Sequence, residues 1–349
     1  MSIPSEPIGS LPRTSDVLNA MTGGDNQALA KAVDVAVRES VEALEAAGSP
    51  VVTDGEQAKT SAWTYPVDGA ENLSPDGVAI PYADGHHRQL PALTAGPLRY
   101  RTRAEQYLRA AQKYAKVPVK QAVVAPSTLS LLYPPSGIAG YPREQFIADL
   151  LDEAEKDIRG CLDAGAHCVQ LDFEEARLSL KLDPSGGLLS TFVELNNQVL
   201  SRFTEAERAR IGVHTSAGSD QDTTHSLDVD YADLLPRLFE LTAGNFYLQL
   251  ASEPDPERVL HIVAQQLRPG IRVFVGVTDP NDPQVETAEQ VRDRVLLAAR
   301  HLPVDQLGTC DDTGFAPYAD DRSTSRQTAL AKIRARIQGT TLAAAQLAG

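Results

Sequence analysis

Short runs of β-branched and apolar residues alternate with longer amphipathic stretches along almost the whole chain. The apolar runs predict strands at 4–9, 51–53, 117–124, 166–171, 210–215, 244–251, 271–277 and 304–309. Apolar residues at helical spacing predict helices near 26–47, 103–115, 143–164, 190–203, 230–242, 255–267, 286–301 and 323–338. Strands that alternate with helices in this way indicate βαβ units and a parallel sheet.

Eight such units in a chain of 349 residues favour an α/β fold of the (β/α)8 TIM-barrel type over a doubly wound sheet. No glycine-rich phosphate-binding motif follows the first strands, so no nucleotide cofactor is expected. Residues 60–100 are less regular, and the turn Ala83-Asp84-Gly85-His86 predicts a hairpin excursion from the main fold. Without a linker or an internal repeat, residues 1–349 are expected to form one domain.

The chain is acidic, with a formal net charge of −15, which argues against nucleic acids and anionic membranes as partners. It has no run of about 18 apolar residues, and its first residues lack a basic region followed by an apolar one. Its three cysteines are scattered and form no CxxC pair, so no disulfide framework is expected. These features predict a cytoplasmic protein whose partner is a small-molecule substrate, and they leave a homodimer open.

The carboxyl ends of the strands in a parallel barrel share one rim, where the active site is built. In this chain those ends carry hydroxyl, carboxylate, imidazole, amide and thiol groups. They are Gly9-Ser10, Asp54-Gly55-Glu56, Pro126-Ser127-Thr128, Asp172 with Glu174, His214-Thr215-Ser216, Gln249, and Cys310-Asp311-Asp312.

Two of these ends are acidic and could together hold a substrate ammonium. The carboxylates of Glu56 and Asp172 compensate a desolvated amine better than a single carboxylate does. Backbone N–H groups in the segment Ile8-Gly9-Ser10 could bind a carboxylate, because the glycine allows close approach. Together these groups suit an α-amino acid. The neighbouring Asp54 and Glu174 are equally suited to capping the segments that follow them.

At these positions the chain resembles the catalytic C-terminal barrel of cobalamin-independent methionine synthase. It resembles more closely the single-barrel relatives of that enzyme, which include epoxyalkane:coenzyme M transferase. The resemblance rests on the order and strand-end positions of several short motifs: Ile8-Gly9-Ser10-Leu11-Pro12, Asp54-Gly55-Glu56, Pro126-Ser127-Thr128, Val169-Gln170-Leu171-Asp172, His214-x-Ser216, and Cys310-Asp311-Asp312-Thr313-Gly314.

The resemblance implies a (β/α)8 barrel in which a zinc ion binds a thiol substrate as its thiolate. The thiolate then takes an alkyl group from a methylated folate or an epoxide, because zinc lowers the pKa of a thiol. The resemblance also implies that Ser10, Glu56 and Asp172 hold the amino-acid part of the substrate, and that no cobalamin takes part.

The sequence departs from the family at the residues that would hold zinc. The family has His-x-Cys on this strand, whereas here His214 is followed by Ser216 at the second ligand position. The family's cysteine on the last strand corresponds to Thr313. Hydroxyl groups are poor ligands for Zn²⁺, so a degenerate or absent zinc site is expected.

An alternative zinc site would use other residues near the same rim. The strand expected to supply a glutamate ends in Gln249, and Glu253 lies four residues further on. Cys310 lies three residues before the expected cysteine, so His214, Cys310 and Glu253 form the alternative set of ligands. Otherwise Cys310 is a small buried hydrophobe, as is expected of the other two cysteines.

The donor is not expected to be a methylated folate. The aromatic residue that the synthase has after this strand corresponds to Tyr133 only with a shift of one position. No cluster of basic residues stands out that would hold a polyglutamate tail.

The main hypothesis is therefore an enzyme that transfers a methyl or other alkyl group to or from a sulfur, or a related nucleophile, of a small amino-acid-like substrate. Lyase chemistry is also open. His214 would act as a general base from a neutral imidazole, with Asp312 orienting it and with Glu56 and Asp172 positioning the substrate. The expected substrate contacts are Ile8, Gly9, Ser10, Glu56, Asp172, Ser127, Tyr133, Ser216 and Gln249.

Two other hypotheses remain: a zinc-dependent thiol alkyltransferase or C–S lyase, and an inactive barrel that only binds a ligand. The remaining histidines have simple structural interpretations. His86 and His87 are expected at a solvated hairpin tip, and His225 is expected to cap a loop.

Overall fold

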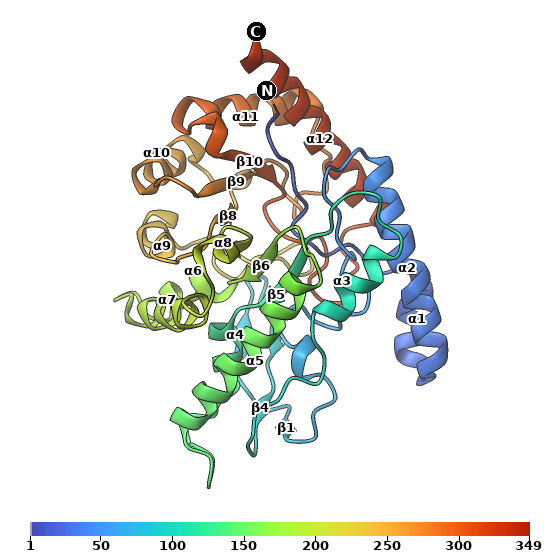
Figure 1. Cartoon of the computed structure of the whole chain (residues 1–349), viewed down its shortest axis with the longest axis vertical. Helices are drawn as coiled ribbons and strands as arrows, with labels where there is room; N and C mark the ends of the chain where they lie inside the picture. The colour runs from blue at the N-terminus through green and yellow to red at the C-terminus, as the bar shows by residue number, and fades with distance from the viewer. Residues whose placement is uncertain (1) are drawn as a thin grey trace.

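The computed structural model describes residues 2–349, so Met1 of the expected domain lies outside it. At its centre, six parallel strands are hydrogen-bonded in the order β5-β6-β7-β8-β9-β10 (Figure 1). Their bounds are β5 (Gln121–Val124), β6 (Val169–Asp172), β7 (Ile211–Thr215), β8 (Asn245–Leu248), β9 (Arg272–Gly276) and β10 (Leu307–Cys310). Almost every residue of these strands is buried, as expected for a parallel sheet that helices cover.

The amino-terminal part of the chain supplies the two remaining positions of the barrel. Ser5 pairs in parallel with β10, and Val52 pairs in parallel with the chain just before β5. The hydroxyl of Thr53 donates to the carbonyl oxygen of Gly9 at 2.9 Å and so joins these two segments. The predicted (β/α)8 barrel is therefore confirmed, with its first two strands reduced to single bridges.

The long helices lie outside the strands, and most of them match the predicted ranges (Figure 1). They begin where capping residues predict, since the side chains of Thr14, Asp25 and Ser325 accept hydrogen bonds from the first turns. Their bounds are α1 (Ser15–Gly23), α2 (Asn26–Ala46), α3 (Glu105–Gln112), α5 (Arg143–Asp163), α7 (Gly187–Leu200), α9 (Tyr231–Leu238), α10 (Pro256–Gln266), α11 (Ala288–His301) and α12 (Arg326–Ala348).

Several short helical turns were not expected from the sequence, and four of them follow or precede barrel strands. They are α4 (Pro126–Ser130), α6 (Glu175–Leu182), α8 (Glu205–Arg208), η1 (Tyr65–Val67) and η2 (Val304–Gln306). Their length explains the omission, because a run of three to eight residues shows too little periodicity to be recognised as a helix. The helix α12 also continues ten residues beyond its predicted end, through a stretch of alanines and threonines.

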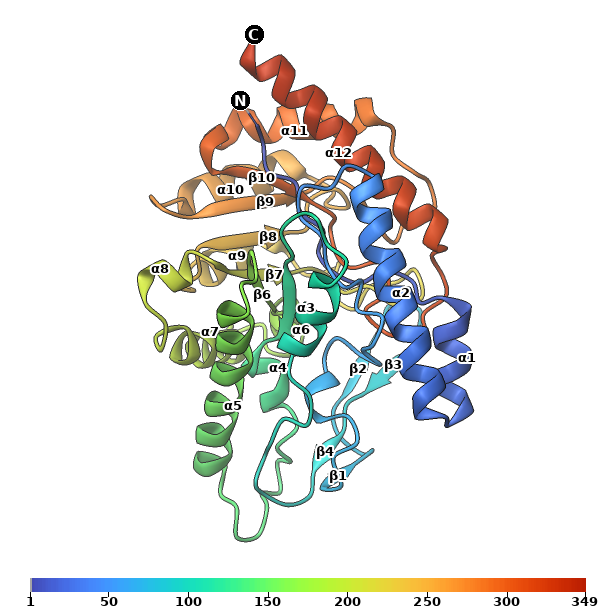
Figure 2. The same ribbon diagram turned by 45° about the vertical axis from the view of Figure 1, so that its right-hand side comes forward.

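The excursion at residues 60–100 forms two small antiparallel sheets. One pairs β1 (Leu73–Ser74) with β4 (Ala92–Leu93), and the other pairs β2 (Ala79–Pro81) with β3 (His87–Gln89). Figure 2 separates the two sheets, with β2 and β3 near α2. The predicted hairpin turn is confirmed, because the N–H of Tyr82 donates to the carbonyl oxygen of His86 at 2.9 Å. We call residues 79–89 the rim hairpin.

The rim hairpin packs onto the barrel through an apolar cluster of its own: Ala62, Trp63, Ile80, Tyr82, Leu90, Leu178 and Tyr318. This cluster joins the excursion to α6 and to the loop after β10, so the hairpin covers part of the rim.

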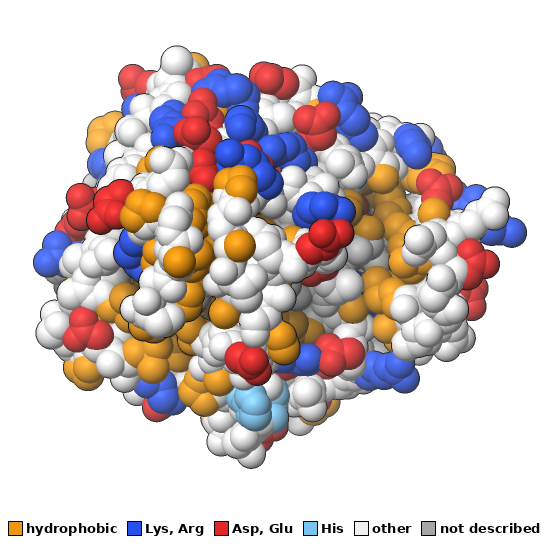
Figure 3. All heavy atoms as spheres, turned by 90° about the horizontal axis from the view of Figure 1, so that it is seen from below, with side chains coloured by type: hydrophobic (Ala, Val, Ile, Leu, Met, Phe, Trp, Pro, Cys, Tyr) orange, Lys and Arg blue, Asp and Glu red, His pale blue; other side chains and the backbone are white. Residues whose placement is uncertain are grey.

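The surface is polar and mixed in charge. In the view of Figure 3, acidic and basic side chains are interspersed among hydrophobic ones. None of the helices within residues 2–349 combines the length and hydropathy needed to span a bilayer.

Candidate active site

The imidazole of His214, at the end of β7, is held between a carboxylate and a carbonyl oxygen. Its Nδ1 lies 2.8 Å from Oε1 of Glu174, and its Nε2 lies 3.1 Å from the backbone oxygen of Asp312. Since both ring nitrogens face acceptors, the doubly protonated ring suits this environment. Burial disfavours the charge, but Glu174 and Asp172 outweigh it and raise the pKa of His214 to about 10. A protonated ring differs from the neutral imidazole that was expected to act as a general base, and that catalytic role stays a prediction.

Glu174 lies at the rim, as expected, but it does not act as the helix cap that was also considered for it. Its side chain makes no capping hydrogen bond to α6. One carboxylate oxygen faces His214, and the other accepts a hydrogen bond of 2.7 Å from the hydroxyl of Ser216. Burial alone would raise the pKa of Glu174, but His214 and Ser216 lower it below its ordinary value. Glu174 and Asp172 are two residues apart, and this spacing at a strand end was the available signal that they lie on one side.

The carboxylate of Asp312 does not orient His214; only its backbone carbonyl does. Both carboxylate oxygens face the loop after β8 and accept the N–H groups of Leu250, Ala251 and Ser252, each at 2.8 Å. The hydroxyl of Ser252 adds a fourth hydrogen bond of 2.7 Å. Asp312 is thus a positioning residue that ties the ends of β8 and β10 together.

Glu56 lies on a tightly turned loop across the barrel. Its φ of 55° follows a φ of 67° at Gly55, so two successive residues have left-handed backbone conformations. A left-handed glutamate is strained, and such strain is concentrated at functional sites. Oε1 of Glu56 lies 2.8 Å from Nζ of Lys59, a buried lysine that the sequence analysis did not single out. Burial lowers the pKa of Lys59, but Glu56 and Asp54 reverse the effect and raise it overall.

These groups surround an enclosed cavity of about 20 Å³. That volume is room for about one water molecule. The lining residues come from several strand ends and from the excursion: Ile8, Gly9, Ser10, Glu56, Ala62, Trp63, Asp172, Glu174, His214, Thr313, Gly314 and Pro317. The structure therefore brings together Ile8, Gly9, Ser10, Glu56, Asp172 and His214 from the expected set.

Residues that line this cavity carry hydrogen-bonding groups that are still open. Oδ1 of Asp172 accepts the amide of Gln170 at 2.7 Å and lies 3.7 Å from Nδ1 of His214. No donor within residues 2–349 engages Oδ2 of Asp172 or Oε2 of Glu56. Likewise, the N–H groups of Gly9 and Ser10 donate to no acceptor among those residues.

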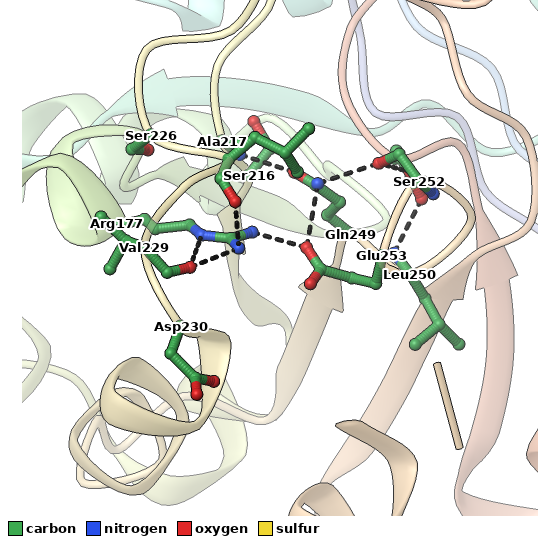
Figure 4. Close-up of polar contacts among 12 residues, drawn as sticks. Arg177, Ser216, Ala217, Ser226, Val229, Asp230, Gln249, Leu250, Ser252 and Glu253 are labelled. Atoms are coloured by element: carbon green, nitrogen blue, oxygen red, sulfur yellow. Dashed lines mark hydrogen bonds and ion pairs between the residues drawn. The ribbon is translucent and has the colours of Figure 1, made fainter. Parts of the chain in front are cut away.

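Four residues expected to contact substrate do not line the cavity: Ser127, Tyr133, Ser216 and Gln249. The hydroxyl of Ser127 accepts from the side-chain amide of Asn196 at 2.9 Å, and that of Tyr133 donates to a backbone oxygen of the neighbouring loop at 2.8 Å. The amide oxygen of Gln249 accepts the N–H of Ala217 at 2.6 Å, and its nitrogen donates to Ser252 and Glu253 (Figure 4). These side chains stabilise loops at the rim.

The alternative zinc ligands are also occupied elsewhere. Glu253 forms an ion pair of 2.5 Å with the buried Arg177 (Figure 4). Cys310 lies in an apolar cluster inside the barrel, with its thiol 3.5 Å from the carbonyl oxygen of Phe274. Neither side chain reaches the cavity wall that His214 lines.

At the positions where the family resemblance places cysteine ligands, the chain has the hydroxyls of Ser216 and Thr313, which are poor ligands for zinc. The carboxylates of Glu174 and Asp172 lie beside Nδ1 of His214, at 2.8 and 3.7 Å, and Nε2 faces the backbone oxygen of Asp312. Within residues 2–349, no group of three or more His, Cys, Asp and Glu side chains is arranged to hold a metal ion.

The rim hairpin is fastened over the cavity by Asp220, whose side chain is fully buried. Its carboxylate accepts from Nε2 of His86 at 2.9 Å and from the guanidinium of Arg88 at 2.7 Å. Arg88 also lies over the ring of Tyr318, 4.2 Å from the centroid, and bonds Asp320. His86 is therefore not a solvated residue at a hairpin tip, as expected, but part of a latch to the loop after β7. His87 is exposed, as expected.

His225 also differs from its expected role. Its ring is buried against the edges of Trp63 and Tyr82, at centroid distances of 6.3 and 5.5 Å, and it does not cap a solvated loop. Burial lowers the pKa of His225 to about 4, so this ring is neutral.

Comparison with known proteins identifies the family of this chain and supports its fold. Residues 3–335 match the family described as cobalamin-independent synthase, catalytic domain. A 5-methyltetrahydropteroyltriglutamate–homocysteine methyltransferase of Synechococcus sp. (strain JA-2-3B'a(2-13)) is 25% identical over 326 residues. The match covers 90% of this chain but 40% of that protein, so the chain spans less than half the length of this curated relative.

Two solved structures share the fold. A B12-independent methionine synthase from Shewanella sp. W3-18-1, in complex with selenomethionine, is 19% identical with a TM-score of 0.80, covering 100% of this chain and 99% of that one. A putative vitamin-B12 independent methionine synthase from Listeria monocytogenes is 20% identical with a TM-score of 0.71, covering 98% of both chains.

Proposed function

Because this chain belongs to the family of cobalamin-independent synthase catalytic domains, we propose that it transfers a methyl or other alkyl group to or from a sulfur of a small amino-acid-like substrate. The proposed site is the cavity between Glu56, Asp172 and His214. The observation that carries the proposal is the set of open groups on residues that line this cavity: the free carboxylate oxygens of Asp172 and Glu56 and the free backbone N–H groups of Gly9 and Ser10.

The free carboxylate oxygens and the free backbone N–H groups match the ammonium and the carboxylate of an α-amino acid. The substrate ammonium would donate to Oδ2 of Asp172 and Oε2 of Glu56, which have no other donor among residues 2–349. The substrate carboxylate would accept the N–H groups of Gly9 and Ser10. Charge-assisted hydrogen bonds of this kind are about twice as strong as neutral ones. The substrate side chain would then extend toward His214 and Thr313.

The proposal includes a site that works without zinc. His214 and Glu174 form a buried ion pair where the family resemblance places the metal, and Ser216 completes it. With both ring nitrogens engaged, His214 positions charge and does not accept the proton of a thiol. Metal analysis of protein purified without chelator is expected to give far less than one zinc per chain. About one zinc per chain, lost in His214→Ala, would contradict this part of the proposal.

Amino-acid binding is tested by calorimetric titration of the full chain with homocysteine and with methionine. Removing a charged hydrogen-bond partner costs about 1.5–3 kcal/mol, so Asp172→Asn should weaken binding by about 10- to 100-fold. Asp183→Asn, at a partly exposed aspartate just after α6, serves as the control. Transfer is then followed by mass spectrometry with isotope-labelled methyl donors. The proposal fails if neither amino acid binds, or if Asp172→Asn binds as tightly as the wild type.

A further inference from the structure

The charges on the cavity wall do not balance. Three carboxylates line it, from Glu56, Asp172 and Glu174. Two of them have a cationic partner at 2.8 Å: Lys59 for Glu56 and His214 for Glu174. Asp172 has only an amide donor and the more distant edge of His214, at 3.7 Å. One negative charge therefore remains uncompensated in a buried space.

A bound amino-acid zwitterion leaves this net charge unchanged, because its ammonium and carboxylate cancel. The group at the end of its side chain then decides the balance. A thiolate would bring a second uncompensated negative charge into the cavity, close to Glu174 and Asp172. Buried like charges are strongly unfavourable, since little solvent screens them. A cationic group would neutralise the cavity.

The apolar part of the wall also suits a cation that carries methyl groups. Trp63 lines the cavity and is buried, and its indole makes an edge contact with the ring of His225. Ala62 and Pro317 complete this side of the wall. The face of an indole attracts alkylated cations, by about 0.5–2 kcal/mol, and the interaction is stronger when water is excluded.

We propose that the reacting end of the substrate in this cavity is an onium group, a sulfonium or an alkylated ammonium, recognised by Glu174, Asp172 and Trp63. This inference rests on the proposed function, because it takes the amino-acid part of the substrate as bound by Glu56, Asp172 and the backbone near Gly9. It deepens that function by assigning the charge of the reacting group.

The test compares two ligands of equal size and different charge. S-methylmethionine is a sulfonium, and ethionine has the same number of non-hydrogen atoms without the charge. Calorimetric titration of the full chain is expected to show S-methylmethionine binding at least tenfold more tightly. Equal or tighter binding of ethionine would overturn the inference and leave the proposed function standing. If neither compound, nor homocysteine, nor methionine binds, the proposed function fails, and this inference fails with it.

Variants separate recognition of the cation from general damage. Glu174→Gln and Trp63→Leu should each weaken S-methylmethionine by about five- to tenfold, with the affinity for ethionine changed less than twofold. Trp63→Phe keeps an aromatic face and should restore part of the loss. Glu175→Gln is the matched control, because Glu175 is the next residue but its carboxylate accepts from Thr128, away from the cavity. Equal losses for both ligands in Glu174→Gln and Trp63→Leu would overturn the assignment.

Discussion

Glu174 lies 2.8 Å from Nδ1 of His214, and its second oxygen accepts the hydroxyl hydrogen of Ser216. This one carboxylate thus joins the end of β6 to two residues at the end of β7. The bond is buried, so both charges depend on each other for compensation. Three of the predictions below concern buried ion pairs of this site, and the fourth concerns the latch above it.

The charge of His214 depends on Glu174. Burial opposes the charge, and Glu174 and Asp172 raise the pKa of His214 to about 10, so the ring should be protonated at pH 7.5. In Glu174→Gln the largest compensating group is gone, so burial should lower the pKa of His214 from its wild-type value. Nitrogen-15 NMR of labelled histidines measures this, with His214→Gln to assign the signal. A neutral His214 in the wild type at pH 7.5 would contradict the prediction.

The ion pair of His214 and Glu174 should also make the free energy of unfolding depend on pH in the alkaline range. A histidine whose pKa is raised by folding contributes stability that is complete below its unfolded pKa of about 6.5. That contribution is lost as the pH rises toward the folded pKa of about 10. Urea unfolding should therefore show a larger loss of stability between pH 7 and pH 10 in the wild type than in His214→Gln. Other groups titrate in this range, so the difference between the two proteins is the quantity to compare, and identical slopes would count against the pair.

The buried pair of Glu56 and Lys59 should show strong coupling. Removing one member leaves the other charge buried and uncompensated, which costs about 3–5 kcal/mol. Lys59→Met and Glu56→Gln should each destabilise the fold by that order, measured by urea unfolding. The double variant should recover at least about 2 kcal/mol of the summed loss, since no lone charge remains. Additive losses would show that the two side chains act independently.

The latch at Asp220 should control exposure of the rim hairpin. Asp220→Asn weakens its bonds to His86 and Arg88, so amide hydrogen exchange in residues 79–89 should quicken by about tenfold or more. Asp84→Asn is the control, because Asp84 contacts the same His86 from the exposed side of the turn. Strands of the barrel should keep their protection in both variants. Unchanged exchange in the hairpin of Asp220→Asn would rule out the latch.

The sequence was sufficient for the barrel because the alternation of strands and helices extends over the whole chain. It was also sufficient to bring Glu56, Asp172 and His214 to one cavity, since the ends of parallel strands share a rim. It was not sufficient to orient side chains there. Ser127 and Gln249 stand at the right strand ends, but both turn to neighbouring backbone and side-chain groups that need partners.

The residues missed in the sequence have ordinary local explanations. Glu174 precedes a helix and suits a cap, and Lys59 lies in an irregular segment without periodicity. The role of Glu174 arises from its contacts with His214 and Ser216, which are distant in sequence. The role of Lys59 arises from its ion pair with Glu56 on a strained turn. The latch on Asp220 is of the same kind, because His86 and Arg88 are more than 130 positions away from it.

The loop after β7 makes two separate stabilising contacts within a few residues. It begins at Ser216, which helps to hold Glu174, and it reaches Asp220, which fastens the rim hairpin. The cavity has room for about one water molecule, so binding an amino acid would require this part of the rim to open. Because this one short loop contacts both Glu174 and the rim hairpin, a movement of the hairpin would also disturb the contacts of Glu174. The ion pair of Glu174 and His214 would then be complete only with the rim hairpin closed. Each turnover would re-form this ion pair as well as close the hairpin.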